Sequence, residues 1–171
     1  MTPTRTCMLC SCPELRLQFT ARDYNRAIDE REFHYAVCDR CRTLQLLDVP
    51  DDLGAYYADD YFHLPERAPD PADANKVDRY KLAILEQFAQ PGELLEIGPG
   101  AGGFIQLAAV AGYRGHVIER DEDCRRFIAE ELGIPAYPGP ENLSGLEDDS
   151  FDCVVLWHVL EHLTDLRGFL D

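Results

Sequence analysis

The run from Glu93 to Phe104, ELLEIGPGAGGF, constrains the fold more than any other stretch of the chain. A short apolar strand at 94–97 leads directly into a glycine-rich turn, and the turn opens a helix over about 103–111. Glycines in such a turn let the backbone approach a ligand, and free N–H groups at the start of the helix meet its polar atoms. The run therefore predicts a nucleotide-cofactor site at the carboxyl end of a strand.

Helix and strand patterns alternate from residue 73 onward. Apolar residues recur at helical spacing over 73–89, and Pro91-Gly92 ends that helix. Further strands are expected at 114–119, 134–137 and 151–157, and further helices at 121–132 and from about 159. The strand at 151–157 is apolar enough to be buried on both faces. The alternation implies right-handed βαβ units, and hence an α/β fold: a Rossmann-like parallel sheet with helices on both faces.

The glycines of the turn fit two cofactor patterns at once. Gly98, Gly100 and Gly103 form G-x-G-x-x-G, the dinucleotide pattern. Glu96 followed by Gly98, Gly100 and Gly102 forms E-x-G-x-G-x-G, which resembles motif I of class I S-adenosylmethionine-dependent methyltransferases. Glu96 favours the second pattern, because a carboxylate beside the turn repels a diphosphate but tolerates the sulfonium and ammonium of S-adenosylmethionine.

Glu119 ends the second predicted strand, 21 residues after Gly98. A carboxylate there can accept two hydrogen bonds from a ribose diol, as in both nicotinamide and S-adenosylmethionine sites. The alternative is a solvated acid at the end of a strand, beside Arg120. Glu119 therefore favours a nucleoside cofactor without distinguishing the two patterns.

The stretch 149–164, DSFDCVVLWHVLEHLT, resembles the fourth strand and following turn of class I methyltransferases. The resemblance implies methyl transfer from S-adenosylmethionine, with the rate coming largely from positioning and desolvation. In such a site Glu119 takes the ribose hydroxyls, Glu141 lies near the adenine, and Trp157 and His158 line the pocket under the methyl donor. The implied cofactor-binding residues are Glu96, Gly98, Gly100, Gly102, Glu119, Glu141, Trp157 and His158. The candidate catalytic base is His158.

Residues 158–162 also fit H-x-x-E-H, a zinc-peptidase pattern. On a helix, His158 and His162 would share a face and could hold zinc with Glu161 beside them. That interpretation needs a third ligand downstream and a motif inside a helix, whereas this one begins at the end of a predicted strand. Capping and packing of the following helix is the simpler role for Glu161 and His162.

Two C-x2-C pairs, Cys7 with Cys10 and Cys38 with Cys41, stand 27 residues apart near the N-terminus. Paired knuckles of this spacing are typical of tetrahedral zinc sites with four thiolate ligands. Cys12 is an additional thiol that could replace Cys10 in the site. A disulfide or a redox C-x-x-C is the alternative, but a chain without an export signal favours a metal site over disulfides.

The patterns divide the chain into three segments: a zinc-ribbon-like module at 1–49, an aromatic and proline-rich connector at 50–72, and a partial S-adenosylmethionine-binding methyltransferase domain at 73–171. Some class I methyltransferases carry a zinc ribbon, and then a segment similar to 49–62, VPDDLGAYYADDYF, before the cofactor domain. Several of these proteins act on sugars or small metabolites, including sugar C-methyltransferases. The resemblance therefore implies a small-molecule methyl acceptor, such as a sugar or another metabolite.

A formal net charge of −16 argues against nucleic acid and anionic membranes as partners. No apolar run approaches ~18 residues, so no membrane span is expected. The N-terminus lacks the apolar core of a signal peptide, and a cytoplasmic location is the expectation.

The predicted strands, in the order 3-2-1-4, make up only part of the seven-stranded sheet that class I methyltransferases have. We therefore hypothesise that the chain is truncated after the fourth strand, whose open edge would allow self-association. Two other functions stay open at this point. One is a non-catalytic zinc- and cofactor-binding fragment that needs a partner or its missing C-terminal half, and the other is an NAD-dependent oxidoreductase.

Overall fold

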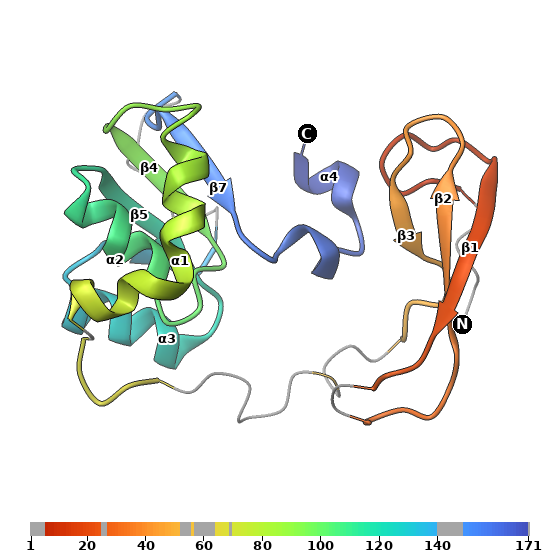
Figure 1. Cartoon of the computed structure of the whole chain (residues 1–171), viewed down its shortest axis with the longest axis horizontal. Helices are drawn as coiled ribbons and strands as arrows, with labels where there is room; N and C mark the ends of the chain where they lie inside the picture. Colours follow the sequence, from red (N-terminus) through yellow and green to blue (C-terminus); the bar gives the residue numbers. More distant parts are fainter. Residues whose placement is uncertain are drawn as a thin grey trace. The chain divides into compact units, whose positions relative to one another are not determined.

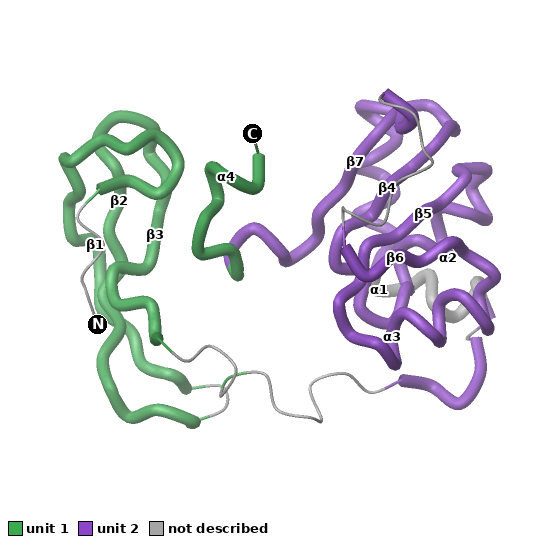
Figure 2. The backbone as a smooth tube through the Cα atoms, turned by 180° about the vertical axis from the view of Figure 1, so that it is seen from behind, with its two compact units in different colours: residues 1–61, 162–171 green, residues 62–161 purple. Residues whose placement is uncertain are grey.

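Figure 1 presents a computed structural model of the whole chain, which describes residues 6–24, 27–51, 56, 64–68, 70–139 and 149–170. Only the backbone is described over 71–77. The chain forms two compact units, one of residues 1–61 with 162–171 and one of residues 62–161 (Figure 2). The predicted boundaries of the three segments stay predictions, and much of the predicted connector at 50–72 lies outside the described residues.

The first unit contains a small antiparallel sheet built from β1 (Leu15–Ala21), β2 (Phe33–Cys38) and β3 (Leu44–Leu46), in the order β1-β2-β3. The pairing of β1 with β2 shifts register between Leu17 and Phe19. Because β2 ends at Cys38, the sheet delivers the second cysteine pair to the turn that follows. The short helix α4 (Leu166–Leu170) also belongs to this unit.

The second unit contains a parallel four-stranded sheet, the kind of sheet that the sequence predicts. Its strands are β4 (Glu93–Ile97), β5 (Arg114–Ile118), β6 (Ala136–Tyr137) and β7 (Cys153–Leu156), in the order β6-β5-β4-β7. Helix α2 (Gly103–Val110) connects β4 to β5. Helix α3 (Glu122–Phe127) and a π-helical turn (Ile128–Leu132) connect β5 to β6. Helix α1 (Pro71–Leu85) precedes the sheet.

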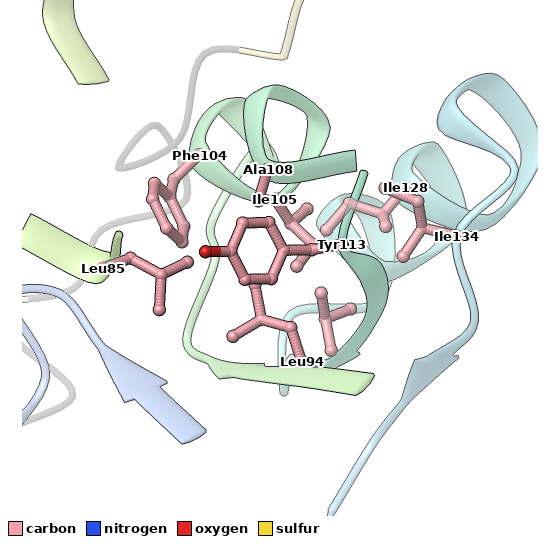
Figure 3. Packing of buried hydrophobic residues seen from close by; sticks show 9 residues of the cluster. Leu85, Leu94, Phe104, Ile105, Ala108, Tyr113, Ile128 and Ile134 are labelled. Atoms are coloured by element: carbon pink, nitrogen blue, oxygen red, sulfur yellow. The ribbon is translucent and has the colours of Figure 1, made fainter. Parts of the chain in front are cut away.

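One face of this sheet carries the core. Register pairs Leu94 with Gly115 and Cys153, and Glu96 with Val117 and Val155, so these residues point to one side. The core cluster joins Leu94 and Val117 to side chains from α1, α2 and the π-helical turn (Figure 3). Helices α1 and α2 and the π-helical turn therefore cover this face of the sheet. The described residues of this unit include no helix on the opposite face, where the sequence also predicts helices.

Three local predictions are wrong. The predicted burial of strand 151–157 on both faces fails, because β7 is an edge strand of the described sheet and Val154 is 49% exposed. The helix predicted over 73–89 ends at Leu85, and Phe88, which the periodicity placed on its apolar face, is 83% exposed in the turn beyond it. The helix expected from about 159 is instead a 3-10 turn (Leu160–His162) followed by α4.

Among the described residues, no helix combines the length and the apolar character that a membrane crossing requires.

Candidate active site

The glycine turn after β4 adopts a backbone that requires its glycines. Gly98, Gly100 and Gly102 have φ values of 71°, 58° and 79°, a left-handed region that disfavours side chains. A Cβ on Gly98 would also lie 2.6 Å from Cγ2 of Val159, which follows β7. The turn is therefore packed against the segment after β7, and the carboxyl ends of β4 and β7 form one continuous edge.

Glu119 follows β5 and reaches the glycine turn. Its Oε2 accepts a hydrogen bond of 3.0 Å from the Gly100 N–H, and its Oε1 accepts one of 2.8 Å from the Asp121 N–H. The residue is only 7% exposed, and burial raises the pKa of its carboxyl, against the opposing effect of these N–H donors. Glu119 is therefore not a solvated acid at the end of a strand, which was the alternative interpretation of its position. With the N–H of Arg120 also acting on it, the carboxylate keeps room for one further donor.

Glu96 is the most deeply buried acid of the site. It is 2% exposed, on the helix-covered face of β4, and its Oε2 has no hydrogen-bond partner among the described residues. Burial raises the pKa of Glu96 to about 8, although the nearby Lys81 opposes this rise. A buried acceptor without a donor is costly in a protein, so its presence beside the turn points to a ligand that supplies a donor or a positive charge.

Helix α1 adds two residues that the sequence analysis missed. Lys81 Nζ lies 2.7 Å from Asp78 Oδ1, and both side chains are only 15% exposed. Asp78 also faces the start of α2, where its Oδ2 would lie 2.9 Å from a Cβ on Gly103. The ammonium of Lys81 stands over the Trp157 ring, 5.8 Å from its centroid. A lysine and an aspartate three residues apart were the available signal, but such pairs are common on exposed helix faces.

Trp157 and His158 follow β7 directly, whereas the sequence predicts Trp157 as the last residue of that strand. Trp157 packs edge-on against Phe104 of α2, with ring centroids 5.3 Å apart, and its Nε1 has no hydrogen-bond partner among the described residues. His158 has a positive φ of 58° and a side chain that is 72% exposed. Its Nε2 lies 3.5 Å from the Tyr80 hydroxyl, and its Nδ1 lies 3.5 Å from Oε1 of Glu161.

The structure therefore brings together, at the carboxyl edge of the sheet, nearly all the predicted cofactor residues: Glu96, Gly98, Gly100, Gly102, Glu119, Trp157 and His158. Glu141, predicted beside the adenine, lies outside the described residues. The H-x-x-E-H stretch lies across a turn and a 3-10 helix rather than inside an α-helix. That geometry does not provide the helical face on which the peptidase interpretation depends.

The family of methyltransferase domains matches residues 70–171, which is more than half of the chain. The chain belongs to this family. No curated protein matches it. The match begins at α1 and includes the whole parallel sheet, so the edge described above is the carboxyl edge of a methyltransferase sheet.

A second candidate site lies in the part of this methyltransferase that precedes the matched domain. The sulfur atoms of Cys7, Cys10, Cys38 and Cys41 all lie within 4.8 Å of one another. The Cys7 and Cys41 sulfurs lie 3.5 Å apart, and the Cys10 and Cys38 sulfurs lie 3.6 Å apart. Four thiolates around a tetrahedral zinc ion, with Zn–S bonds of about 2.3 Å, stand about 3.8 Å apart. The cluster could therefore hold a metal ion, and all seven cysteines are free thiols rather than disulfides.

Hydrogen bonds to the sulfur atoms support this arrangement. The Cys41 N–H donates to Cys38 Sγ at 3.5 Å, as backbone groups do around metal-bound thiolates. The pKa of Cys41 is lowered to about 6 because the hydroxyl and N–H of Thr43 bond to its sulfur. Cys12, the additional thiol, instead donates to Glu14 Oε2 at 2.8 Å. Cys12 is therefore occupied elsewhere in this arrangement, although it packs beside the cluster.

Proposed function

We propose that this protein is a class I methyltransferase that transfers a methyl group from S-adenosylmethionine to a small molecule. The observation that carries the proposal is Glu96, a buried acid two residues before the glycine turn, whose Oε2 has no partner among the residues that the structure describes. S-Adenosylmethionine carries a sulfonium and an ammonium, which suit such an oxygen. A dinucleotide would instead place a diphosphate near the turn, and its negative charge would disfavour ionisation of Glu96 rather than supply the positive charge that favours it.

The remaining residues of the site fit the same cofactor. The Glu119 carboxylate has room for a hydrogen bond from the ribose diol, and the positive-φ glycines leave the backbone accessible to the methionine part. Trp157 lies on the same edge, and its indole N–H has no hydrogen-bond partner among the described residues. When bound, S-adenosylmethionine supplies an electrophilic methyl group, and the chain's own residues bind and orient the reactants.

Titration calorimetry on the full chain tests this proposal with S-adenosylhomocysteine and NAD as probes. We expect binding of S-adenosylhomocysteine and none of NAD. Binding of NAD alone would instead support an oxidoreductase, and binding of neither would favour a non-catalytic fragment. Glu119→Gln should weaken the binding of S-adenosylhomocysteine about tenfold, because the variant lacks the charged acceptor for the ribose hydroxyls. Glu131→Gln, an exposed charge change on the π-helical turn, is the matched control and should leave the affinity unchanged.

We further propose that the four-cysteine cluster holds a structural zinc ion and makes residues 1–49 a zinc ribbon. Metal analysis of the purified full chain should find one zinc per molecule. Cys38→Ser should lose it, because a hydroxyl is a poor substitute for a thiolate ligand. Cys124→Ser is the matched control, since Cys124 is buried in the other unit. Zinc retained in Cys38→Ser would refute the assignment.

The acceptor proposed here is a sugar or another small metabolite, because the order of a cysteine module, a segment like 49–62 and a cofactor domain resembles that of methyltransferases several of which act on such molecules. The strongly acidic composition supports a small acceptor over nucleic acid. Self-association through β7, an edge strand of the described sheet, is a separate proposal. Sedimentation of the full chain over a range of concentrations tests it, and a monomer throughout would exclude it.

A further inference from the structure

The polypeptide around His158 is anchored on both sides to the glycine turn and the helix that follows it. Trp157 before it packs on Phe104 in the first turn of α2, and Val159 after it packs against Gly98. Between these two anchors His158 takes a left-handed backbone conformation, with φ of 58°, which few non-glycine residues adopt. Such outliers persist where the surroundings enforce them, and they cluster at functional sites.

The consequence of this conformation is that the imidazole stands outside the core. Its side chain is 72% exposed, while Trp157 behind it is half-buried against Phe104. The imidazole is therefore presented at the carboxyl edge of the sheet, next to the proposed cofactor site and accessible to a second molecule. A residue that served only to pack the turn would not need this exposure.

Both ring nitrogens of His158 face a polar partner. Oε1 of Glu161 lies 3.5 Å from Nδ1, and the hydroxyl of Tyr80 on α1 lies 3.5 Å from Nε2. A carboxylate beside Nδ1 favours the tautomer with the proton on Nδ1, which leaves Nε2 as an acceptor. The Tyr80 hydroxyl then occupies the position from which another hydroxyl could approach Nε2. These distances are long for hydrogen bonds, as is common at catalytic groups before substrate binds.

We propose that Glu161 positions His158 so that its Nε2, which faces the Tyr80 hydroxyl in the free protein, accepts the proton of a hydroxyl-bearing methyl acceptor. In that step the acceptor oxygen forms the O–CH3 bond as the S–CH3 bond breaks, and the electron pair of that bond stays on sulfur. The acceptor's proton passes to Nε2, and the resulting imidazolium is stabilised by Glu161. Glu161 is a positioning residue, the acceptor hydroxyl takes the place of the Tyr80 hydroxyl at Nε2, and His158 meets the acceptor directly.

This inference rests on the proposed methyl transfer and narrows it to an acceptor that must lose a proton. A neutral hydroxyl becomes a strong nucleophile only as its proton leaves, so a base at this place is useful to it. A neutral amine is already nucleophilic and does not need one. The chemistry of the edge therefore favours a hydroxyl over an amine as the methylated group.

Two measurements on the full chain test the positioning without any acceptor. Long-range 15N–1H correlation spectra report the tautomer of each of the five histidines, and His158→Gln assigns the signal. Carbethoxylation by diethyl pyrocarbonate, followed by peptide mass spectrometry, reports how readily the neutral imidazole attacks an electrophile. Both are made at about pH 8, where an ordinary imidazole is neutral.

We expect the Nδ1–H tautomer for His158 in the wild-type protein. Glu161→Gln should weaken that preference and slow carbethoxylation about fivefold, because a charge-assisted hydrogen bond becomes a neutral one. Tyr80→Phe should keep the tautomer and speed the reaction, since Nε2 loses its neighbour. Glu131→Gln removes a remote charge and should change neither. An Nε2–H tautomer in the wild type, or equal slowing by Glu161→Gln and Glu131→Gln, would overturn the proposal.

The two proposals can fail separately. Glu161 is not among the residues assigned to the cofactor, so the Glu161→Gln variant should bind S-adenosylhomocysteine as tightly as the wild type does. If the chain binds no S-adenosylhomocysteine, the methyl-transfer proposal fails even when the imidazole has the expected tautomer. If binding is normal but the tautomer is not as expected, only the role of Glu161 in positioning His158 is lost.

Discussion

Replacing Glu96 by glutamine should change how the stability of this methyltransferase depends on pH. Burial raises the pKa of Glu96 from its ordinary 4.5 to about 8 in the folded protein. Between those values the folded chain holds a proton that the unfolded chain has released. Stability therefore falls as pH rises through this window, by about 1.4 kcal/mol per pH unit and on the order of 5 kcal/mol across it. A glutamine stays neutral at every pH, so the variant does not lose stability in this way.

The free energy of unfolding of Glu96→Gln minus that of the wild type should increase from pH ~5 to ~8 and should stay constant above pH ~8. Urea unfolding of the full chain at several pH values measures it. Fluorescence of Trp157, the single tryptophan, follows the unit that contains Glu96. Comparing the variant with the wild type at each pH removes the contribution of all groups that they share.

Glu93→Gln is a matched control from the first position of the same strand. A hydrogen bond from Arg114 lowers the pKa of Glu93, so its contribution is present at neutral pH and is lost as pH falls. The difference for Glu93→Gln should therefore change in the acid range and with the opposite sign. A difference for Glu96→Gln that stays constant from pH ~5 to ~8 would refute the reasoning, because it would mean that the buried carboxyl titrates normally.

Three further outcomes are expected. Gly98→Ala should destabilise the second unit by about 2 kcal/mol or more in urea unfolding, because a side chain at positive φ also meets Val159. Leu94→Ala should cost roughly 3 kcal/mol, since Leu94 is fully buried in the core. Chelation of the proposed zinc should lower the melting temperature of the first unit in calorimetry, and Cys38→Ser should abolish that sensitivity.

Local patterns in the sequence were enough to predict much of the site. The glycine turn after β4 and the acid after β5 depend on neighbouring residues and on the alternation of strands with helices. Parallel strands place their carboxyl ends on one edge, so Gly98 and Glu119 were expected to converge. The cysteine pairs were predictable for a similar reason, because each knuckle is a short local turn.

Other features depend on packing between elements and could not be predicted. The apolar residues of α1 predicted only a helix that packs on the core. The structure shows that the same helix also carries Asp78 and Lys81, an ion pair that is largely buried. Burial of such a pair requires a partner surface that the sequence of one helix does not reveal. The positive φ of His158 arises because its two neighbours are anchored elsewhere, and the exposure of Val154 follows from its place on an edge strand.

The hydrogen bond from the Gly100 N–H to Glu119 links the shape of the glycine turn to the group proposed to receive the ribose. A ligand that draws on the same carboxylate must share it with that amide. The Gly100 amide is therefore an internal reporter: its proton chemical shift and its rate of exchange with solvent should respond when the ribose position fills. One backbone resonance could then be used to screen candidate cofactors, with no need for a methyl acceptor.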